Sequence, residues 1–299
     1  MAFLHNPLTL PIYVPALVLS FCRGMLVPTL PLYARSLDAS YGLIGIVLAA
    51  EGLGTLAGDI PAGMLFGRLG QRRSMLLGLA VLAAATFAMS WAGSVLELVM
   101  YGFVSGLGVA IWNISRHAYI TDATPSYSRG RAIALFGGIN RIGIFMGPAV
   151  GGFIASAYGL RAPFVLFGIL ATITLVFPAF FARETTSTRV VHRGGVRGHT
   201  THLWQVIREN YRTLTPAGIG QLLAQMIRAG RKIVIPLFGA DVLGLDVAQI
   251  GVVISMAAAI DMTMFYPAGV IMDRFGRKFA YVPCFLIQGV AMAMIPFTT

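Results

Sequence analysis

Basic side chains inside apolar stretches are the residues of this sequence that packing explains least. Arg23 lies midway along an apolar run near the start of the chain. In a later run, Arg228, Arg231 and Lys232 follow at i, i+3 and i+4, which places them on one face of a helix. One such charge at the centre of a membrane helix costs about 2.5 to 3.5 kcal/mol, so three facing lipid would cost roughly 8 to 10 kcal/mol. We expect this face to point toward a cavity or a partner.

Acidic side chains inside apolar stretches are the natural partners of these cations. They are Glu51 and Asp261, with Asp59 nearer the end of its run. A carboxylate that alternates between water and a cationic partner can load and release a proton, so Glu51 and Asp261 are candidates for proton coupling. A permanent ion pair, Glu51 with Arg23 or Asp261 with Arg228, is the alternative that the sequence leaves open.

The elements that must hold these charges are apolar helices. The chain has 299 residues, of which 57% are hydrophobic and 11% charged, about half the charged share of a soluble domain. Runs long enough to cross a hydrocarbon layer of about 30 Å recur from end to end, which excludes an ordinary water-soluble enzyme. The sequence predicts an all-α, multi-pass protein embedded in a lipid bilayer. The expected spans cover 11–34, 43–65, 74–92, 95–118, 133–157, 162–181, 213–239, 248–271 and 279–298.

The distribution of basic residues predicts the orientation of these spans. The chain has 22 lysines and arginines against 11 acids. In the connections between spans, fourteen basic residues lie on one side and two, Arg35 and Arg161, on the other. Because cytoplasmic loops are enriched in Lys and Arg, this asymmetry predicts that the amino terminus lies in the cytoplasm. The membrane is expected to be the inner or plasma membrane. The basic charge therefore reflects topology, and no nucleic-acid partner is expected.

Cysteine and histidine give no sign of a metal or cofactor site. Cys22 and Cys284 both fall in apolar stretches and are expected to be small core residues. His192, His199 and His202 share one polar interval, but without further ligands a solvated loop explains them better than a metal site. No zinc-protease spacing, P-loop or nucleophile elbow is visible in the sequence. We expect no metal, no cofactor and no enzyme activity.

An internal repeat predicts two halves of similar structure. Residues 23–33 begin with arginine and end with proline, leucine and an aromatic residue, and this pattern recurs at 228–238. The Pro-Ala-Gly sequence at 61–63 recurs at 267–269. The separation stays at 205 to 206 residues, which is typical of the parallel repeats of secondary transporters.

The repeat also predicts the domain organisation. We expect a complete six-helix transmembrane bundle at 1–182, a basic cytoplasmic linker at 183–212 and three helices of a second, parallel bundle at 213–299. Since the second half lacks three spans, the sequence favours a fragment of a twelve-helix protein cut after the ninth helix. A natural nine-helix relative is the alternative.

Two glycine-rich basic segments follow the second and eighth spans. Residues 63–73 and 269–278 both resemble the cytoplasmic loop signature of the major facilitator superfamily, Gly-x-x-x-Asp-Arg-x-Gly-Arg-Arg. The signature's aspartate is kept as Asp273 but is replaced by Gly67 in the first copy. An aspartate against a helix amino terminus can latch two bundles, and the resemblance implies that Asp273 faces the start of the fifth span. The candidate gating residues are Gly63, Arg68, Gly70, Arg72, Arg73, Gly269, Asp273, Arg274, Gly276, Arg277 and Lys278.

The fifth span carries a face of small residues. Gly143, Gly147 and Gly151 lie four residues apart, and Pro148 removes a backbone donor and favours a bend. The segment is similar to the antiporter signature of the same superfamily, which implies a pivot between the two halves. Ordinary small-residue packing is the alternative. The candidate pivot residues are Arg141, Gly143, Gly147, Pro148, Gly151 and Gly152, and Arg116 on the fourth span is expected at a gate or interface.

The resemblance is to the proton-coupled drug-efflux antiporters of this superfamily, and it implies a major facilitator fold that works by alternating access. It places the first, fourth and seventh spans around a central cavity, whereas lipid or core packing is the alternative for Phe21 and Trp112. The implied function is export of small amphipathic organic compounds in exchange for protons, by a monomer of the full-length protein. The alternative is import of an organic anion bound by Arg23, Arg228 and Arg231. The candidate cavity-lining residues are Phe21, Trp112, Asn113 and Gln225.

Overall fold

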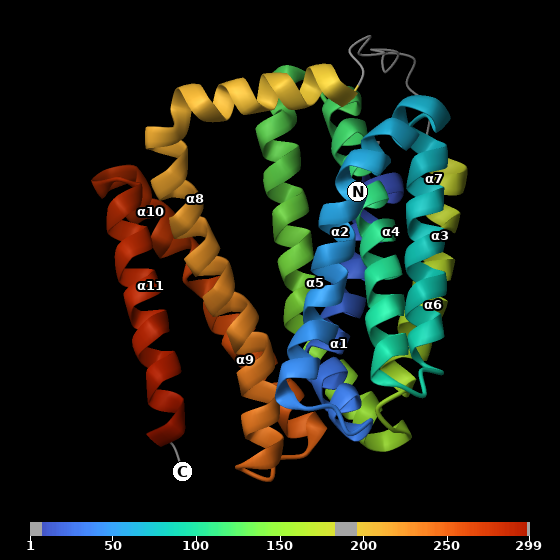
Figure 1. Ribbon diagram of the computed structural model, residues 1–299, viewed down its shortest axis with the longest axis vertical. Helices are drawn as coiled ribbons and strands as arrows, with labels where there is room; N and C mark the ends of the chain where they lie inside the picture. Colours follow the sequence, from blue (N-terminus) through green and yellow to red (C-terminus); the bar gives the residue numbers. More distant parts are fainter. Residues whose placement is uncertain (1–7, 183–195, 298–299) are drawn as a thin grey trace. The chain divides into compact units, whose positions relative to one another are not determined.

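The described residues form helices from end to end. The computed structural model of this protein describes residues 8–182 and 196–297, and every regular element within these ranges is a helix (Figure 1). This confirms the predicted all-α fold class. The elements are η1 (Thr9–Tyr13), α1 (Val14–Ser36), α2 (Tyr41–Leu69), α3 (Gln71–Met89), α4 (Val95–Ala123), η2 (Ser126–Ser128), α5 (Arg129–Tyr158), α6 (Ala162–Thr174), α7 (Val176–Phe181), α8 (Val196–Asp241), α9 (Val247–Thr263), α10 (Phe265–Phe275), α11 (Arg277–Met294) and η4 (Ile295–Phe297).

The first six predicted spans are confirmed. Among the described residues, six helical runs are long and apolar enough to cross a membrane: η1 with α1, then α2, α3, α4, α5, and finally α6 with α7. The last of these runs is interrupted between α6 and α7. Pro178 lacks the backbone N–H that would bond to the Thr174 carbonyl, and α6 ends at Thr174. One proline therefore accounts for the break.

The last three predicted spans differ more from the expectation. α8 is kinked at Asn210, whose backbone dihedral angles are not helical. The part of α8 before this kink is helical, although a polar linker was predicted there. A seventh span is present only if α9 and α10, which are separated at Met264, are taken as one. Within the described residues, α8 and α11 do not meet the criterion of length and composition: α8 carries six lysines and arginines, and the apolar part of α11, Val282–Met294, is short. Six or seven of the nine predicted spans are therefore supported by this criterion.

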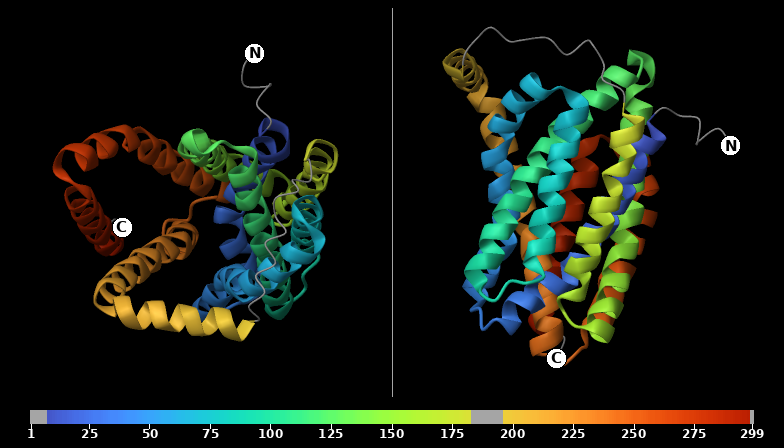
Figure 2. Two further views of the ribbon diagram at one scale, coloured as in Figure 1. Left: turned by 90° about the horizontal axis from the view of Figure 1, so that it is seen from above. Right: turned by 90° about the vertical axis from the view of Figure 1, so that its right-hand side faces the viewer.

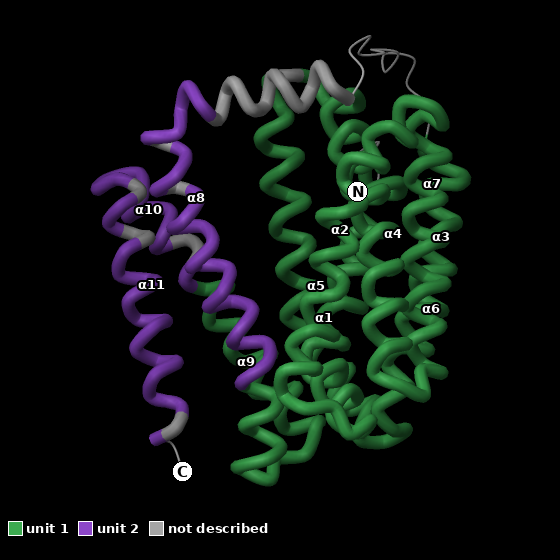
Figure 3. Tube along the Cα trace, viewed as in Figure 1, with its two compact units in different colours: residues 1–188, 235–263 green, residues 189–234, 264–299 purple. Residues whose placement is uncertain are grey.

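The chain divides into two compact units, which Figure 3 shows in different colours. The first unit contains residues 1–188 and 235–263, and the second contains 189–234 and 264–299. α9 belongs to the first unit because it packs against α5 there. Of the expected linker, residues 183–195, including His192, lie outside the described residues. The division into a bundle, a linker and a second bundle stays a prediction.

Helices of the first unit approach one another through glycine. α3 packs against both α4 and α6 (Figure 2), and α4 also packs against α2. A Cβ atom added to Gly78 would lie 2.6 Å from the Trp112 backbone nitrogen, and one added to Gly108 would lie 2.7 Å from the Leu82 nitrogen. Such distances leave no room for a larger residue, so α3 and α4 pack backbone to backbone.

The two cysteines have different surroundings. Cys22 on α1 is buried in the apolar core of the first unit, as expected. Cys284 on α11 is exposed, so the expectation that it is a core residue is wrong. Among the described elements of the second unit, α11 packs mainly against α10, which leaves much of its surface uncovered.

Candidate functional site

An ion pair joins the first two helices of the first unit. Arg23 on α1 donates from Nη2 to Oε1 of Glu51 on α2 over 2.8 Å. The two side chains are 39% and 42% exposed, so the pair lies at the edge of the packed core and not inside it. The Arg23–Glu51 pairing that the sequence left open is therefore present. The proton-coupling role of Glu51 stays a prediction.

The backbone around Glu51 is anchored to α4. The Thr55 hydroxyl donates to the Glu51 carbonyl oxygen over 2.8 Å and lies 3.2 Å from the Gly106 carbonyl oxygen. Gly106 allows this approach, since a Cβ atom there would lie 2.7 Å from the Thr55 nitrogen. The anchor uses the backbone of Glu51 and leaves its carboxylate for Arg23. The ion pair can therefore open without separating α2 from α4.

A second arginine interacts electrostatically with this pair. The Arg116 guanidinium on α4 lies 4.2 Å from the centre of the Phe136 ring on α5, and its Nη2 lies 3.0 Å from His117 Nε2. Its Nε is buried without a hydrogen-bond partner among the described residues. Arg116 and Arg23 are close enough to repel each other electrostatically. Sequence reasoning missed Phe136, because a ring contact between two helices leaves no spacing signal.

The four predicted cavity-lining residues have different surroundings. Trp112 is 3% exposed and belongs to the apolar core, which agrees with the packing alternative. Phe21 is half-buried against the same core, and Asn113 is also half-buried. Gln225 lies in the second unit, where its Oε1 accepts a hydrogen bond from Arg228 Nη1 over 3.1 Å. Lining of a substrate cavity stays a prediction for these residues.

The cations of α8 and the acid of α9 belong to different units. In the second unit Arg228 and Lys232 are exposed and Arg231 is half-buried. Asp261 is exposed on α9, in the first unit. The alternative pairing of Asp261 with Arg228 stays a prediction, as does the inward orientation of the charged α8 face.

The glycine face of α5 packs against α1. A Cβ atom added to Gly143 would lie 2.6 Å from the Phe21 nitrogen, and one added to Gly147 would lie 2.6 Å from the Gly24 Cα atom. One turn farther on, a Cβ atom at Gly151 would lie 2.5 Å from a backbone atom of α1. The predicted small-residue face is therefore a close helix crossing. Arg141 lies exposed on the same helix, before this crossing.

A second face of α5 packs against α9. A Cβ atom added to Gly152 would lie 2.6 Å from the Val247 carbonyl oxygen, and one added to Gly251 would lie even closer to the Pro148 carbonyl oxygen across the same contact. The Ala149 backbone N–H, next to Pro148, donates to the Ser255 hydroxyl over 2.9 Å. α5 thus lies in backbone contact with a helix from each half of the sequence repeat. The pivot role stays a prediction.

The first glycine-rich segment makes a helix junction. Gly70 ends α2 and precedes α3 with φ 80° and ψ 176°, a conformation open almost only to glycine. The Gln71 amide beside it is buried and donates to Asp122 on α4. Arg72 donates to the Ala179 carbonyl oxygen in the last turn of α7. By contrast, a Cβ atom at Gly63 or Gly67 would meet open space, so the fold does not require glycine there; the other predicted gating residues of this segment, Arg68 and Arg73, are exposed.

The second glycine-rich segment repeats the junction in the other unit. Gly276 ends α10 and precedes α11 with φ 92° and ψ 160°. A Cβ atom at Gly269 would meet open space, as at its counterpart in the first segment. The predicted gating residues Asp273, Arg274 and Lys278 are exposed in the second unit, and the Arg277 side chain lies outside the described residues. The latch between Asp273 and the start of α5 stays a prediction.

The chain is similar to bacterial drug-resistance proteins. Multidrug resistance protein 2 of Bacillus subtilis (strain 168) is 24% identical over 279 residues, which cover 91% of this chain and 68% of that protein. Quinolone resistance protein NorA of Staphylococcus aureus (strain MRSA252) is 24% identical over 153 residues, which cover 51% of this chain and 39% of NorA.

The fold is similar to that of a solved transporter. A bacterial homologue of the human lysosomal transporter Spinster, solved in an inward-facing and occupied conformation, superposes with a TM-score of 0.75 at 16% identity. The match covers 94% of this chain and 64% of that structure, so the chain spans less than two thirds of its length. The sequence profile of the Major Facilitator Superfamily matches residues 13–299. The chain therefore belongs to the Major Facilitator Superfamily.

Proposed function

We propose that this protein exports small amphipathic organic compounds across an inner or plasma membrane in exchange for protons. Membership of the superfamily and six apolar helices make it a multi-pass membrane transporter. Two relatives are named for multidrug and quinolone resistance, which supports this substrate class and direction. The basic connections support a cytoplasmic amino terminus. We expect the protein to work as a monomer.

The Arg23–Glu51 ion pair is the observation that carries the proton coupling. A carboxylate inside a membrane protein needs either a cation or a proton to offset its charge. In the paired state the Arg23 guanidinium supplies that charge at 2.8 Å. When Arg23 moves away, a proton can replace it, and the half-exposed position gives water access to the carboxylate. Because Thr55 and Gly106 hold only the backbone, this exchange needs no helix separation.

In this proposal, α5 and the two glycine-rich segments carry out the conformational change of alternating access. α5 meets α1 at Gly147 and α9 at Gly152 without intervening side chains, so small rotations there change few contacts. The junctions at Gly70 and Gly276 would close the cytoplasmic side, with Asp273 latching onto the start of α5.

Import of an organic anion is the weaker candidate. It depends on Arg23 and the α8 cations being available to an anionic substrate. Arg23 already has an acidic partner in Glu51, which neutralises the charge that would attract an anion. Arg228 is also engaged, with Gln225.

Everted membrane vesicles with an imposed proton gradient test the proposal. We expect Glu51→Gln to abolish export driven by the gradient while exchange of labelled for unlabelled substrate at equal pH continues, because exchange needs no net proton movement. Asp59→Asn is the matched control, since Asp59 is an exposed acid on the same helix. It should change neither rate by more than about twofold.

Two outcomes would contradict the coupling role. Gradient-driven export by Glu51→Gln at the wild-type rate would mean that Glu51 carries no transported proton. Loss of exchange together with gradient-driven export would assign the Arg23–Glu51 pair a structural role instead.

A further inference from the structure

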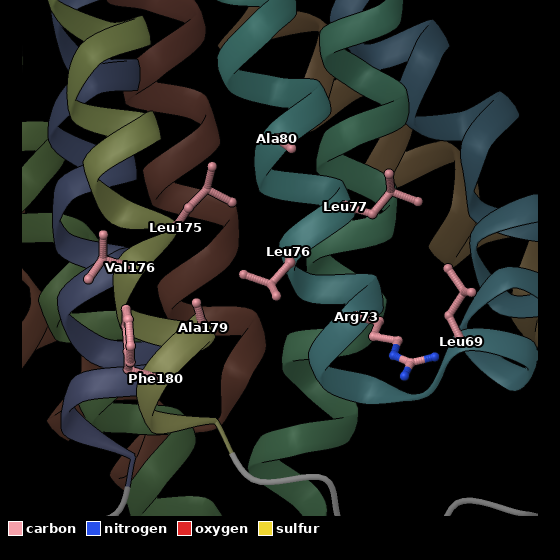
Figure 4. Close-up of a pocket in the computed structure, with 9 residues that line it drawn as sticks. All are labelled: Leu69, Arg73, Leu76, Leu77, Ala80, Leu175, Val176, Ala179 and Phe180. Atoms are coloured by element: carbon pink, nitrogen blue, oxygen red, sulfur yellow. The ribbon is translucent and has the colours of Figure 1, made fainter.

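An apolar groove runs between α3 and α7 in the first unit. Figure 4 shows Leu76 and Ala80 on the α3 wall, with Leu175 and Phe180 on the opposite wall. The cavity has a volume of about 630 Å³. Apart from Arg73 at one end, every lining residue is apolar. We call this cavity and its continuation the α3–α7 groove.

The groove continues along α3 beyond this cavity. A second cavity of about 380 Å³ shares Ala80 and Leu175 with the first and reaches Phe87. Arg73 and Phe87 are fourteen residues apart on one helix, about 21 Å at 1.5 Å per residue. One leaflet of a bilayer has a hydrocarbon depth of about 15 Å, half of about 30 Å. The groove is therefore long enough to hold an acyl chain that crosses one leaflet.

Arg72 and Arg73, at one end of the groove, make different contacts. Arg72 donates to the Ala179 carbonyl oxygen, one of the acceptors that a helix end leaves without an intrahelical partner. It thus fastens the start of α3 to the end of α7. Arg73 lines the groove, and none of the described residues forms an ion pair or hydrogen bond with it. A cation without a partner among the described residues, at the end of an apolar groove, is complementary to a ligand with an anionic head and an apolar tail.

We propose that the α3–α7 groove binds one anionic phospholipid, with an acyl chain along α3 and the phosphate at Arg73. Arg68, exposed in the last turn of α2, adds positive charge to the same junction. Basic residues beside a membrane helix attract anionic headgroups, and arginine binds phosphate oxygens through several donors at once. This site is separate from the proposed proton-coupling pair, since neither Arg23 nor Glu51 lines it.

Native mass spectrometry of the purified protein tests this site. The protein is titrated with phosphatidylglycerol and, separately, with phosphatidylcholine of the same acyl chains. We expect Arg73→Gln to weaken retention of one phosphatidylglycerol about fivefold and to leave phosphatidylcholine unchanged, because only the headgroup contact is lost. Arg131→Gln is the charge-matched control: it removes an exposed arginine at the start of α5, away from the groove, and should change neither lipid.

Filling the groove tests the acyl chain. Ala80→Phe places a ring where the two cavities meet, and Val176→Phe places one in the first cavity from the opposite wall. Both residues line the groove in exposed positions. Each variant should weaken retention of both lipids about tenfold or more. Equal phosphatidylglycerol retention by wild type, Arg73→Gln and both filled variants would overturn the proposal. Displacement of the lipid by inorganic phosphate alone, or a second copy of the chain in place of the lipid, would also overturn it.

Discussion

The two copies of the repeat begin and end their helices with similar local structures. α2 begins after Ser40, whose hydroxyl accepts from the Leu43 N–H over 3.4 Å. α9 begins after Asp246, 206 residues later, whose Oδ2 accepts from the Ala248 N–H over 3.2 Å. At the other end, the junctions at Gly70 and Gly276 have φ of 80° and 92°. The duplicated segments therefore start and stop their helices in the same way.

The same two copies differ in what their charges contact. Arg23 pairs with an acid on the neighbouring helix, whereas Arg228, its counterpart, bonds to Gln225 one turn earlier on its own helix. The backbone of a junction is restricted to glycine by sterics, while a side-chain partner is restricted only by the chemistry that it serves. The two copies thus share the backbone geometry of their junctions and differ in the partners of their charged side chains.

Removing the two corresponding arginines should have unequal effects. Arg23→Gln leaves the Glu51 carboxylate without its cation, and we expect a loss of about 2 to 3 kcal/mol in the free energy of unfolding. Arg228→Gln loses only a hydrogen bond to Gln225, so a loss below about 1 kcal/mol is expected. Thermal unfolding in detergent measures both. The double variant Arg23→Gln with Glu51→Gln should recover most of the loss, and equal effects of the two single variants would remove this difference between the copies.

The two junction glycines should respond alike. Gly70→Ala and Gly276→Ala each place a Cβ atom on a backbone that L-residues rarely adopt, which costs about 1 to 2 kcal/mol. Gly63→Ala is the control, because its Cβ atom would meet open space and its conformation is helical. It should lose no stability. A thermal unfolding shift for Gly70→Ala as small as that for Gly63→Ala would contradict the duplicated junction.

Sequence reasoning reached the features that leave a periodic or repeated signal. It predicted the six spans of the first half, the repeat and the glycine face of α5, because hydropathy and small-residue spacing report on burial and close packing. It missed Phe136, the exposure of Cys284 and the groove at Arg73. These depend on which helices become neighbours in space, and residue spacing along one helix does not encode that.

Restoring the missing acid of the first segment should change stability little. In Gly67→Asp the new side chain meets open space. It lies near the end of α2, whose dipole disfavours a negative charge, and near the start of α3, whose dipole favours it. The two contributions are each a few tenths of a kcal/mol and oppose one another, so the change should stay within about 0.5 kcal/mol. A loss of 2 kcal/mol or more would show that glycine at 67 has a structural reason that the backbone does not reveal.

The two helix caps should differ in their pH dependence. The Ser156 hydroxyl donates a hydrogen bond to the Asp246 carboxylate and holds the pKa of that carboxyl below its usual range. Burial acts in the opposite direction but is the smaller effect. The unfolded chain then binds a proton before the folded one does, so this contribution is complete above about pH 4 and is lost as the pH falls through the folded pKa. Solvent screening limits it to a few tenths of a kcal/mol.

Exchanging the caps measures this smallest effect. Asp246→Ser introduces the cap residue of the first repeat, and the thermal unfolding midpoint should then fall less steeply as the pH is lowered below about 4. Ser156→Ala should reduce this fall in part. Ser40→Asp is the reciprocal variant and should steepen the fall. An identical fall in wild type and Asp246→Ser would show that the cap makes no measurable contribution.

Proton release on substrate binding tests the central claim most directly. Purified protein in weakly buffered detergent solution, with a pH-sensitive dye, reports protons released or bound when a transported compound is added. We predict that wild type releases protons near neutral pH as the Arg23–Glu51 pair re-forms, and that Glu51→Gln binds the compound without proton release. Proton release by Glu51→Gln equal to that of wild type would contradict the account.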